Sequence, residues 1–243
     1  MIKDHYDVIR KNKIAFWWFL GRRDLFKKIL GKEIKTKVAM GVDIGCGPAT
    51  NESLYPYFSD NWISLDHSKK SFEDWEKNGS LPLIADIISI PLKVKSADLC
   101  FLLDVLEHLE NESKALQEIN KIIKNGGYLL ISVPAFKILW SFHDEQAGHK
   151  KRYRGKELER ISEENGFEVV RSLYFNSFLF LPILIIRKIL RISSKGKNTL
   201  EINLSPKFLD KVLYLILKIE NFINLNIIKI PFGTSFVVLL RKK

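Results

Sequence analysis

Short apolar runs alternate with stretches of helical periodicity along most of this chain of 243 residues. The runs have the length of buried strands and lie at residues 38–42, 62–66, 81–86, 96–103 and 128–133, with two more at 167–173 and 235–240. Between the first five, apolar residues recur every three or four positions, as they do on one face of a helix. This alternation predicts an α/β fold built on a parallel, doubly wound sheet.

The helical periodicity predicts helices over residues 4–30, 51–58, 68–78 and 112–124. The first of these carries an aromatic cluster at residues 16–19, followed by Gly21, Arg22 and Arg23. Such a helix can simply pack on the domain, or it can form a lid over a cofactor site. We expect it to do both.

A glycine turn follows the first strand. Residues 42–49 read Val-Asp-Ile-Gly-Cys-Gly-Pro-Ala, so Gly45 and Gly47 precede Pro48, which suits the first turn of a helix. The third glycine of a dinucleotide fingerprint is missing, and Asp43 would repel a pyrophosphate. The turn therefore favours a cofactor with a positively charged end, although glycine pairs of this kind also occur in plain tight turns.

Acidic residues mark the carboxyl ends of the first four strands, where ligands bind in sheets of this type. Asp66 lies 19 residues after Gly47, the distance at which a carboxylate accepts hydrogen bonds from ribose hydroxyls. The alternative is an ordinary surface aspartate. Asp43, Asp86 and Asp104 stand at the other strand ends.

These motifs resemble, over about residues 38–173, the class I S-adenosylmethionine-dependent methyltransferases. The resemblance implies a Rossmann-like sheet of seven strands and S-adenosyl-L-methionine as the cofactor. It also implies that Asp43 and the glycines hold the methionine portion, that Asp66 binds the ribose, and that Asp86 takes the exocyclic amine of the adenine. The cofactor-binding residues expected on this basis are Asp43, Gly45, Cys46, Gly47, Asp66, His67, Asp86, Ile87, Asp104 and Val105.

Two further segments resemble a bacterial subgroup associated with cell-surface polysaccharide or lipid-linked sugar pathways. One is the aromatic segment 17–23, and the other runs from residue 134 to residue 153. Residues 104–109 are similar to the motif after the fourth strand in quinone-type and small-molecule methyltransferases. We expect substrate contacts from Glu107, His108, Trp140, Arg152 and Tyr153.

The segment after the fifth strand carries the candidate acid–base groups. Transfer to an oxygen acceptor requires a positioned base, and we expect His143 or His149 to be that base, with Asp144 orienting it and Arg152 holding an anionic part of the substrate. The competing interpretation is a hydrogen-bonded network that only shapes the loop.

Asp104, Glu107 and His108 share one helical turn by their spacing and, with a further ligand, could bind a divalent metal. Three ligands without a fourth are weak evidence, so we expect no metal and assign these residues to shaping the cofactor and substrate sites.

The C-terminal part departs from the resemblance, because about sixty residues separate the last two predicted strands. We expect a lid at residues 1–36, a cofactor-binding core at 37–173, an apolar helical insertion at 174–232 and the final strand at 233–243. The insertion combines apolar runs with flanking Lys and Arg, which is typical of helices lying on an anionic membrane. The alternatives are burial within a helical subdomain or against a second subunit as a homodimer.

Charge and cysteine content complete these expectations. Thirty-nine Lys and Arg against 28 Asp and Glu give a net charge of +11, which suits an anionic partner or only a basic surface. The basic residues lie among aliphatic runs, so nucleic acid is not expected as the partner. Two cysteines and a charged N-terminus without an apolar core indicate a reducing, cytoplasmic location, peripheral to the inner face of the cell membrane. The predicted function is methylation of a small or lipid-linked acceptor at oxygen; a quinone-type ring is the alternative acceptor, and a non-catalytic cofactor-binding scaffold is the alternative role.

Overall fold

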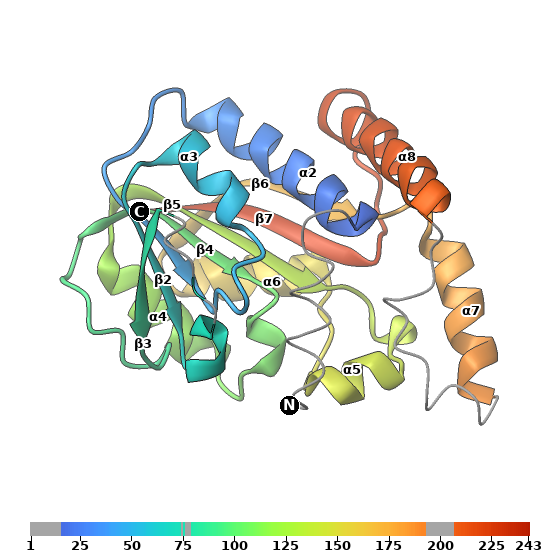
Figure 1. The fold of residues 1–243 in the computed structure, drawn as a ribbon, viewed down its shortest axis with the longest axis horizontal. Helices are drawn as coiled ribbons and strands as arrows, with labels where there is room; N and C mark the ends of the chain where they lie inside the picture. The colour runs from blue at the N-terminus through green and yellow to red at the C-terminus, as the bar shows by residue number, and fades with distance from the viewer. Residues whose placement is uncertain (1–15, 74, 76–78, 193–206) are drawn as a thin grey trace.

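The computed structural model describes residues 16–73, 75, 79–192 and 207–243. In these residues seven strands form one sheet in the order β3-β2-β1-β4-β5-β7-β6 (Figure 1). Strands β1 to β5 pair in parallel, whereas β7 is antiparallel to both of its neighbours. The strand bounds are β1 Gly41–Ile44, β2 Trp62–Asp66, β3 Ser80–Ile84, β4 Ala97–Leu103, β5 Ile123–Pro134, β6 Phe167–Phe175 and β7 Ser235–Lys242. The predicted doubly wound, Rossmann-like sheet is confirmed.

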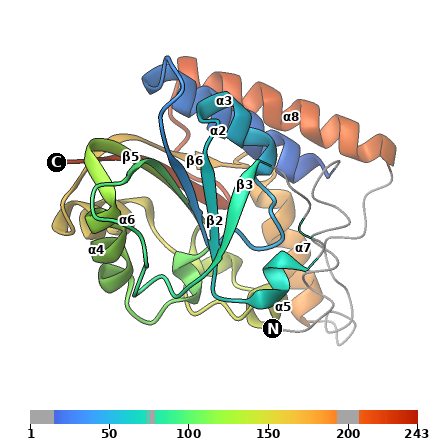
Figure 2. The same ribbon diagram turned by 60° about the vertical axis from the view of Figure 1, so that its left-hand side comes forward.

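Helices cover both faces of the sheet (Figures 1 and 2). One face packs against α2 (Trp17–Glu33), α3 (Tyr55–Phe58) and α8 (Lys207–Asn226), and the other packs against α4 (Glu112–Ile122) and α6 (Gly155–Glu164). Each face has its own apolar core, because consecutive strand residues alternate between the two sides. Phe101 faces α2 and α3, for example, whereas Leu102 faces α4.

The short elements lie in the connections. They are the 3₁₀ turns η1 (Glu52–Leu54), η2 (Lys69–Phe72), η3 (Leu106–His108) and η4 (Lys137–Leu139), and the short helix α5 (Phe142–Ala147). Two of them, η3 and α5, lie past the carboxyl ends of parallel strands, where ligands bind in sheets of this type: η3 follows β4, and α5 follows β5 after η4.

Several helix boundaries differ from the prediction. Of the first predicted helix, residues 4–15 lie outside the described chain, and α2 runs to Glu33 instead of residue 30. The expected helix at 51–58 is a 3₁₀ turn followed by the four residues of α3. The expected helix at 68–78 is wrong in its described part: Ser68 does cap a turn, by accepting from the Lys70 amide, but the backbone becomes extended at Glu73. Helix α4 ends at Ile122 because Ile123 turns extended and pairs with Ala97.

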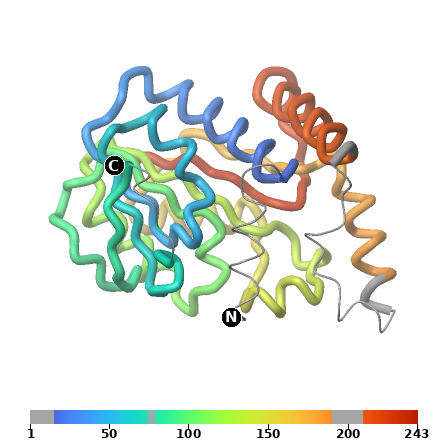
Figure 3. Tube along the Cα trace, in the orientation of Figure 1, coloured from blue at the N-terminus to red at the C-terminus, as the bar shows by residue number. Residues whose placement is uncertain are grey.

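Among the residues that the structure describes, two helices lie between β6 and β7, as predicted: α7 (Phe180–Ile192) and α8 (Figure 3). Helix α8 lies beside α2, where the Asn221 side-chain amide donates to the Gly21 carbonyl oxygen over 2.9 Å and Leu217 is fully buried. Burial of that face agrees with the packing alternative for α8. The other side of α8 keeps Leu215 and Phe222 55% and 58% exposed, and α7 keeps Leu181, Ile185 and Ile189 between 56% and 62% exposed. Among the described residues, no helix is both long enough and apolar enough to cross a bilayer.

Candidate active site

The glycine turn after β1 leaves open space in front of its backbone. Gly45 and Gly47 have φ of +70° and +51°, a left-handed conformation that glycine adopts without steric cost. A Cβ added at Gly45 would lie 2.4 Å from a methyl group of Val105, whereas one added at Gly47 would meet no described residue within 4 Å. The loop is therefore packed from behind by Val105 and open in front, a shape that accepts a ligand close to the main chain.

Asp66 ties this loop to the end of β2. One carboxylate oxygen accepts from the Gly47 amide over 2.9 Å and the other from the Ser68 amide over 2.8 Å, while the side chain is only 5% exposed. Each oxygen keeps a second lone pair, so the carboxylate can still accept from two hydroxyls. His67 beside it is an exposed side chain, with Nδ1 3.5 Å from Asp66.

Asp43 is buried beneath the loop. Its Oδ2 accepts from the Tyr55 hydroxyl over 2.7 Å, and its Oδ1 accepts no hydrogen bond from the described residues. Burial raises the pKa of Asp43 to about 7, although the hydrogen bond from Tyr55 partly offsets that rise. Burial likewise raises the pKa of the neighbouring Cys46 thiol, so this cysteine stays protonated and supports the loop by packing.

The adenine-side candidates lie past the end of β3. Asp86 is exposed, and its carboxylate accepts from the Ile88 amide over 3.1 Å, which fixes the turn. Ile87 is buried in the core on the α4 side of the sheet. The structure thus places Asp86 where a polar ring edge can reach it, with Ile87 supporting the turn from below.

Asp104, at the end of β4, is bound by a residue that sequence reasoning did not single out. Its Oδ2 accepts from Arg22 of α2 and its Oδ1 from the Ser132 hydroxyl over 2.9 Å. Arg22 is buried, and its guanidinium lies 4.3 Å from the centre of the Trp18 ring. The available signal was its position: Arg22 occupies the same helical stripe as Phe19, Phe26 and Ile29, so a charge there needs a buried partner.

The candidate base lies in the segment after β5. Asp144 caps α5 by accepting from the Ser141 amide over 2.9 Å, and it also accepts from His149 Nδ1 over 2.8 Å. The chain turns back at Gly148, immediately after the helix, which brings His149 next to Asp144 in the first turn of that helix. Because a carboxylate can only accept, Nδ1 carries the proton of this hydrogen bond, and Nε2 is turned away from Asp144.

The charge of Asp144 is held in place by arginines. Arg152 donates to its two oxygens over 2.8 and 3.0 Å, and Arg187 of α7 lies 3.9 Å away. Burial alone would raise the pKa of Asp144, but the hydrogen bonds from His149 and Arg152 outweigh it and hold that pKa well below its usual range. Asp144 is consequently a fixed anion that orients His149.

Three polar side chains surround this pair, namely Glu107, His108 and His143. Glu107 Oε1 is 3.9 Å from His149 Nε2, and the His149 ring lies 4.9 Å from that of His108 and 6.2 Å from that of His143. The Lys150 amide donates to the Glu107 carbonyl oxygen over 2.7 Å, which joins the segment after β5 to η3. Since Val105 precedes η3 by one residue and packs on Gly45, the histidine cluster adjoins the glycine turn.

Two expected substrate contacts have a different environment from the one predicted. Arg152 is 3% exposed and committed to Asp144, so it is not free to bind an anionic ligand by itself. Tyr153 is fully buried, and its hydroxyl donates to the Leu106 carbonyl oxygen over 3.1 Å, a supporting position. Beside Arg152 lies a hollow of about 420 Å³ that is also lined by Lys137 and Arg154. Trp140 is half-buried in the short link from η4 to α5.

The chain is similar to known proteins over most of its length. A family model described as "Methyltransferase domain" matches residues 42–131. An uncharacterized protein of Methanocaldococcus jannaschii, MJ0638, is 31% identical over 191 residues, covering 74% of this chain and 80% of that protein. Mouse tRNA (carboxymethyluridine(34)-5-O)-methyltransferase ALKBH8 is 29% identical over 145 residues, which are 56% of this chain but 20% of the mouse protein.

The fold also has solved counterparts. One is in the complex between the Haloferax volcanii Trm112 methyltransferase activator and a methyltransferase, with a TM-score of 0.62 and 14% identity. The match covers all of this chain and 97% of that one. At this identity the likeness shows a common fold.

Proposed function

This chain belongs to the class I S-adenosylmethionine-dependent methyltransferases, and we propose that it transfers the methyl group to an oxygen atom of a small or lipid-linked acceptor. The observation that carries the proposal is the buried hydrogen bond between Asp144 and His149, which lies next to the glycine turn and has Glu107, His108 and His143 around it. A hydroxyl acceptor must lose a proton, and this cluster is built to take one.

The residues at the sheet edge fit S-adenosylmethionine. The open front of Gly47 admits the cofactor to the main chain, the spare lone pairs of Asp66 suit the ribose hydroxyls, and Asp86 suits the adenine amine. The orphan oxygen of Asp43 is free to accept a hydrogen bond from the ammonium group, whose positive charge would favour the ionised form of this carboxyl. When bound, the cofactor supplies a methyl group already activated on a sulfonium.

This chain's own residues then align the acceptor and accept its proton. We assign the base to His143 or His149, and Asp144 orients His149 through Nδ1. Fixed alignment accounts for much of the rate in such displacements, because the reacting atoms no longer have to meet by diffusion. The hollow lined by Lys137, Arg152 and Arg154, and also by Glu157, carries more basic than acidic side chains and would hold an anionic group of the acceptor, with Arg152 acting as a fixed charge behind it.

A lipid-linked acceptor is favoured by α7. The helix carries exposed Leu181, Ile185 and Ile189 on one side, and its Arg187 donates to the Leu139 carbonyl oxygen over 2.7 Å and lies beside Asp144. An apolar surface that is physically joined to the acid–base cluster suits a substrate whose reactive group is carried by a membrane-embedded chain. With a net charge of +11, the surface concerned would be anionic lipid on the cytoplasmic side.

RNA is a second candidate acceptor. The relatives from mouse and from Arabidopsis thaliana are named as tRNA methyltransferases that act at an oxygen, and a strongly basic protein is attracted to phosphates. The matched part is a fifth of the mouse protein, so its substrate comes to this chain only as a candidate.

The experiment is identification of the labelled product. The protein is incubated with S-adenosylmethionine carrying a ¹³C methyl group and with cell extract divided into lipid, aqueous small-molecule and RNA fractions. We expect a new O-methyl carbon signal in the lipid or small-molecule fraction. A label found on nitrogen or carbon would refute the oxygen assignment, and a label in nuclease-sensitive material would replace the small acceptor with RNA. A matched reaction with the Asp144→Asn variant controls for contaminating activity and should lose most of the signal.

A further inference from the structure

Glu107 is a buried carboxylate with no hydrogen-bond donor. Its side chain is 1% exposed, and neither Oε1 nor Oε2 accepts a hydrogen bond from any residue that the structure describes. Leaving such a group unpaired in a protein interior is costly unless something compensates its charge. Its backbone carbonyl oxygen, by contrast, accepts from the Lys150 amide, so the turn itself is well held.

A ring nitrogen of His149 faces this carboxyl group. Nδ1 of His149 is held by Asp144, so Nε2 is the ring nitrogen left for another ligand, and it lies 3.9 Å from Glu107 Oε1. That separation is too long for a hydrogen bond. A metal ion placed between the two atoms could be bound by both.

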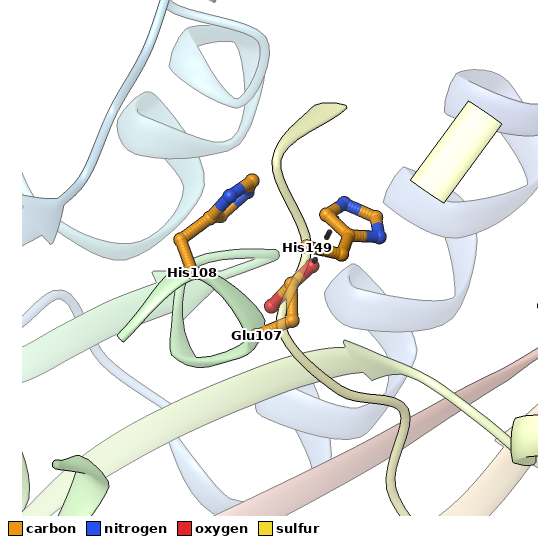
Figure 4. Close-up of side chains that lie close together, drawn as sticks. All are labelled: Glu107, His108 and His149. Atoms are coloured by element: carbon orange, nitrogen blue, oxygen red, sulfur yellow. Dashed lines mark ion pairs between the residues drawn. The ribbon is translucent and has the colours of Figure 1, made fainter. Parts of the chain in front are cut away.

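His108 completes the arrangement. One donor atom each from Glu107, His108 and His149 lies within 4.8 Å of the other two, and the three side chains converge from two segments of the chain (Figure 4). Glu107 and His108 come from η3, and His149 follows α5, so the fold brings the set together.

We propose that Glu107, His108 and His149 bind a divalent cation of the first transition series. Two imidazoles and one carboxylate are the donors that such ions prefer, whereas Mg²⁺ and Ca²⁺ prefer oxygen donors. Asp144 supplies the expected outer partner, since metal-binding histidines commonly donate their other ring nitrogen to a carboxylate. Three protein ligands leave a coordination position for a further molecule.

The role of this cation in the transfer rests on the proposed function, although its binding does not. A cation here would lower the pKa of an acceptor hydroxyl brought next to it. It would also decide between the two candidate bases: His149 would be a ligand, and His143, in the first turn of α5, would take the proton.

The test is a titration of the full-length protein with Co²⁺ after dialysis against a chelator. Cobalt reports its ligands through visible absorption, and no acceptor or methyl transfer is needed. We expect one Co²⁺ per chain, an intense visible band typical of low coordination number, and displacement by Zn²⁺. Absence of saturable binding to the native chain would overturn the proposal.

Variants locate the site. Glu107→Gln and His149→Gln should each weaken Co²⁺ binding at least 10-fold, and Asp144→Asn should weaken it about 10- to 100-fold by loosening His149. Glu110→Gln is the matched control, because Glu110 is close in sequence and 85% exposed, and it should bind as the native chain does. Native affinity in both Glu107→Gln and His149→Gln would place the ion elsewhere and refute the assignment.

Thermal unfolding separates a ligand from a merely structural residue. Without metal, Glu107→Gln should melt at or above the native temperature, because it removes a buried, unpaired carboxylate. With Zn²⁺ at 100 times the dissociation constant, the native chain should gain roughly 5–10 °C and the variant should gain little. An equal metal-induced gain in both chains would contradict the proposal. If methyl transfer is unchanged after chelation, the cation has no catalytic role, although the binding site itself is not refuted. If the chain binds the metal tightly but transfers no methyl group, the metal site is supported and the proposed function is contradicted.

Discussion

Asp144 performs three tasks with one carboxylate: it caps α5, fixes the tautomer of His149 and pairs with Arg152. Because donors from three residues hold both carboxylate oxygens, the side chain of Asp144 is fixed in place and can fix the position of His149. Sequence reasoning found the residue and its link to His149, but it assigned Arg152 to the substrate. Only the folded chain shows that the guanidinium is already occupied by Asp144.

The buried carboxyl of Asp43 should make the stability of the folded chain depend on pH. Its folded pKa of about 7 lies above the ordinary value near 4, so between these values the folded chain holds a proton that the unfolded chain has lost. Stability contributed by the protonated form is therefore present at low pH and is lost as the pH rises through about 7.

Asp43→Asn should remove this loss. Between pH 4.5 and pH 7.5 we expect the free energy of unfolding of the native chain to fall relative to the variant by roughly 4 kcal/mol at most, since one pKa unit is about 1.4 kcal/mol. Urea unfolding without cofactor measures both proteins, and Asp60→Asn at an exposed site is the control. Parallel pH profiles for the native chain and Asp43→Asn would show that this carboxyl is not perturbed.

At the scale of elements, helices outside the sheet complete the site. Arg22 connects α2 to Asp104 after β4, and Arg187 connects α7 to η4 and lies beside Asp144. Both arginines lie on helices whose function the amphipathic pattern left open. The pattern predicted that these helices exist, because apolar residues recur at helical spacing. It did not predict the ion pairs, because each joins residues more than forty positions apart.

Helix α7 should determine membrane binding. Changing Leu181, Ile185 and Ile189 to Asp together removes apolar contact and adds negative charge on the exposed side of the helix. In flotation with vesicles containing anionic lipid at moderate salt, the native chain should float and this variant should lose at least nine-tenths of the floating fraction. Higher salt should weaken the native binding, because the basic residues would be screened.

A matched variant makes the flotation result specific. Leu81, Ile84 and Val94 are 55–71% exposed and lie at or after the edge strand β3, away from α7, so the same three changes to Asp there alter net charge and apolar surface equally. This control should float as the native chain does. A native chain that stays at the bottom of the gradient, or equal losses in both variants, would rule out α7 as the membrane surface.

At the scale of the whole molecule, the strands and the type of sheet could be predicted from the sequence, whereas the structure of the short connections could not. Buried strands leave a strong apolar signal, and the glycine turn, with Asp66 19 residues after Gly47, predicts that the cofactor binds at this edge of the sheet. The expected helix at 68–78 failed because a serine-capped turn and a true helix start with the same residues. The cluster of Glu107, His108 and His149 is a product of tertiary structure, since η3 and the segment after α5 meet only once the sheet has formed.

The central claim is that this sheet edge binds S-adenosylmethionine and directs its methyl group to an acceptor in the neighbouring cluster. The most direct measurement is the rate of S-adenosylhomocysteine formation with and without cell extract, comparing the native chain with Asp66→Ala and with Asp60→Ala as the exposed control. We predict product from the native chain and the control only when extract is present. At limiting cofactor we predict at least a 10-fold lower rate for Asp66→Ala, because that change removes the carboxylate that we propose binds the ribose and frees the Gly47 amide. Equal rates for Asp66→Ala and the native chain, or no extract-dependent product from any of them, would contradict the account.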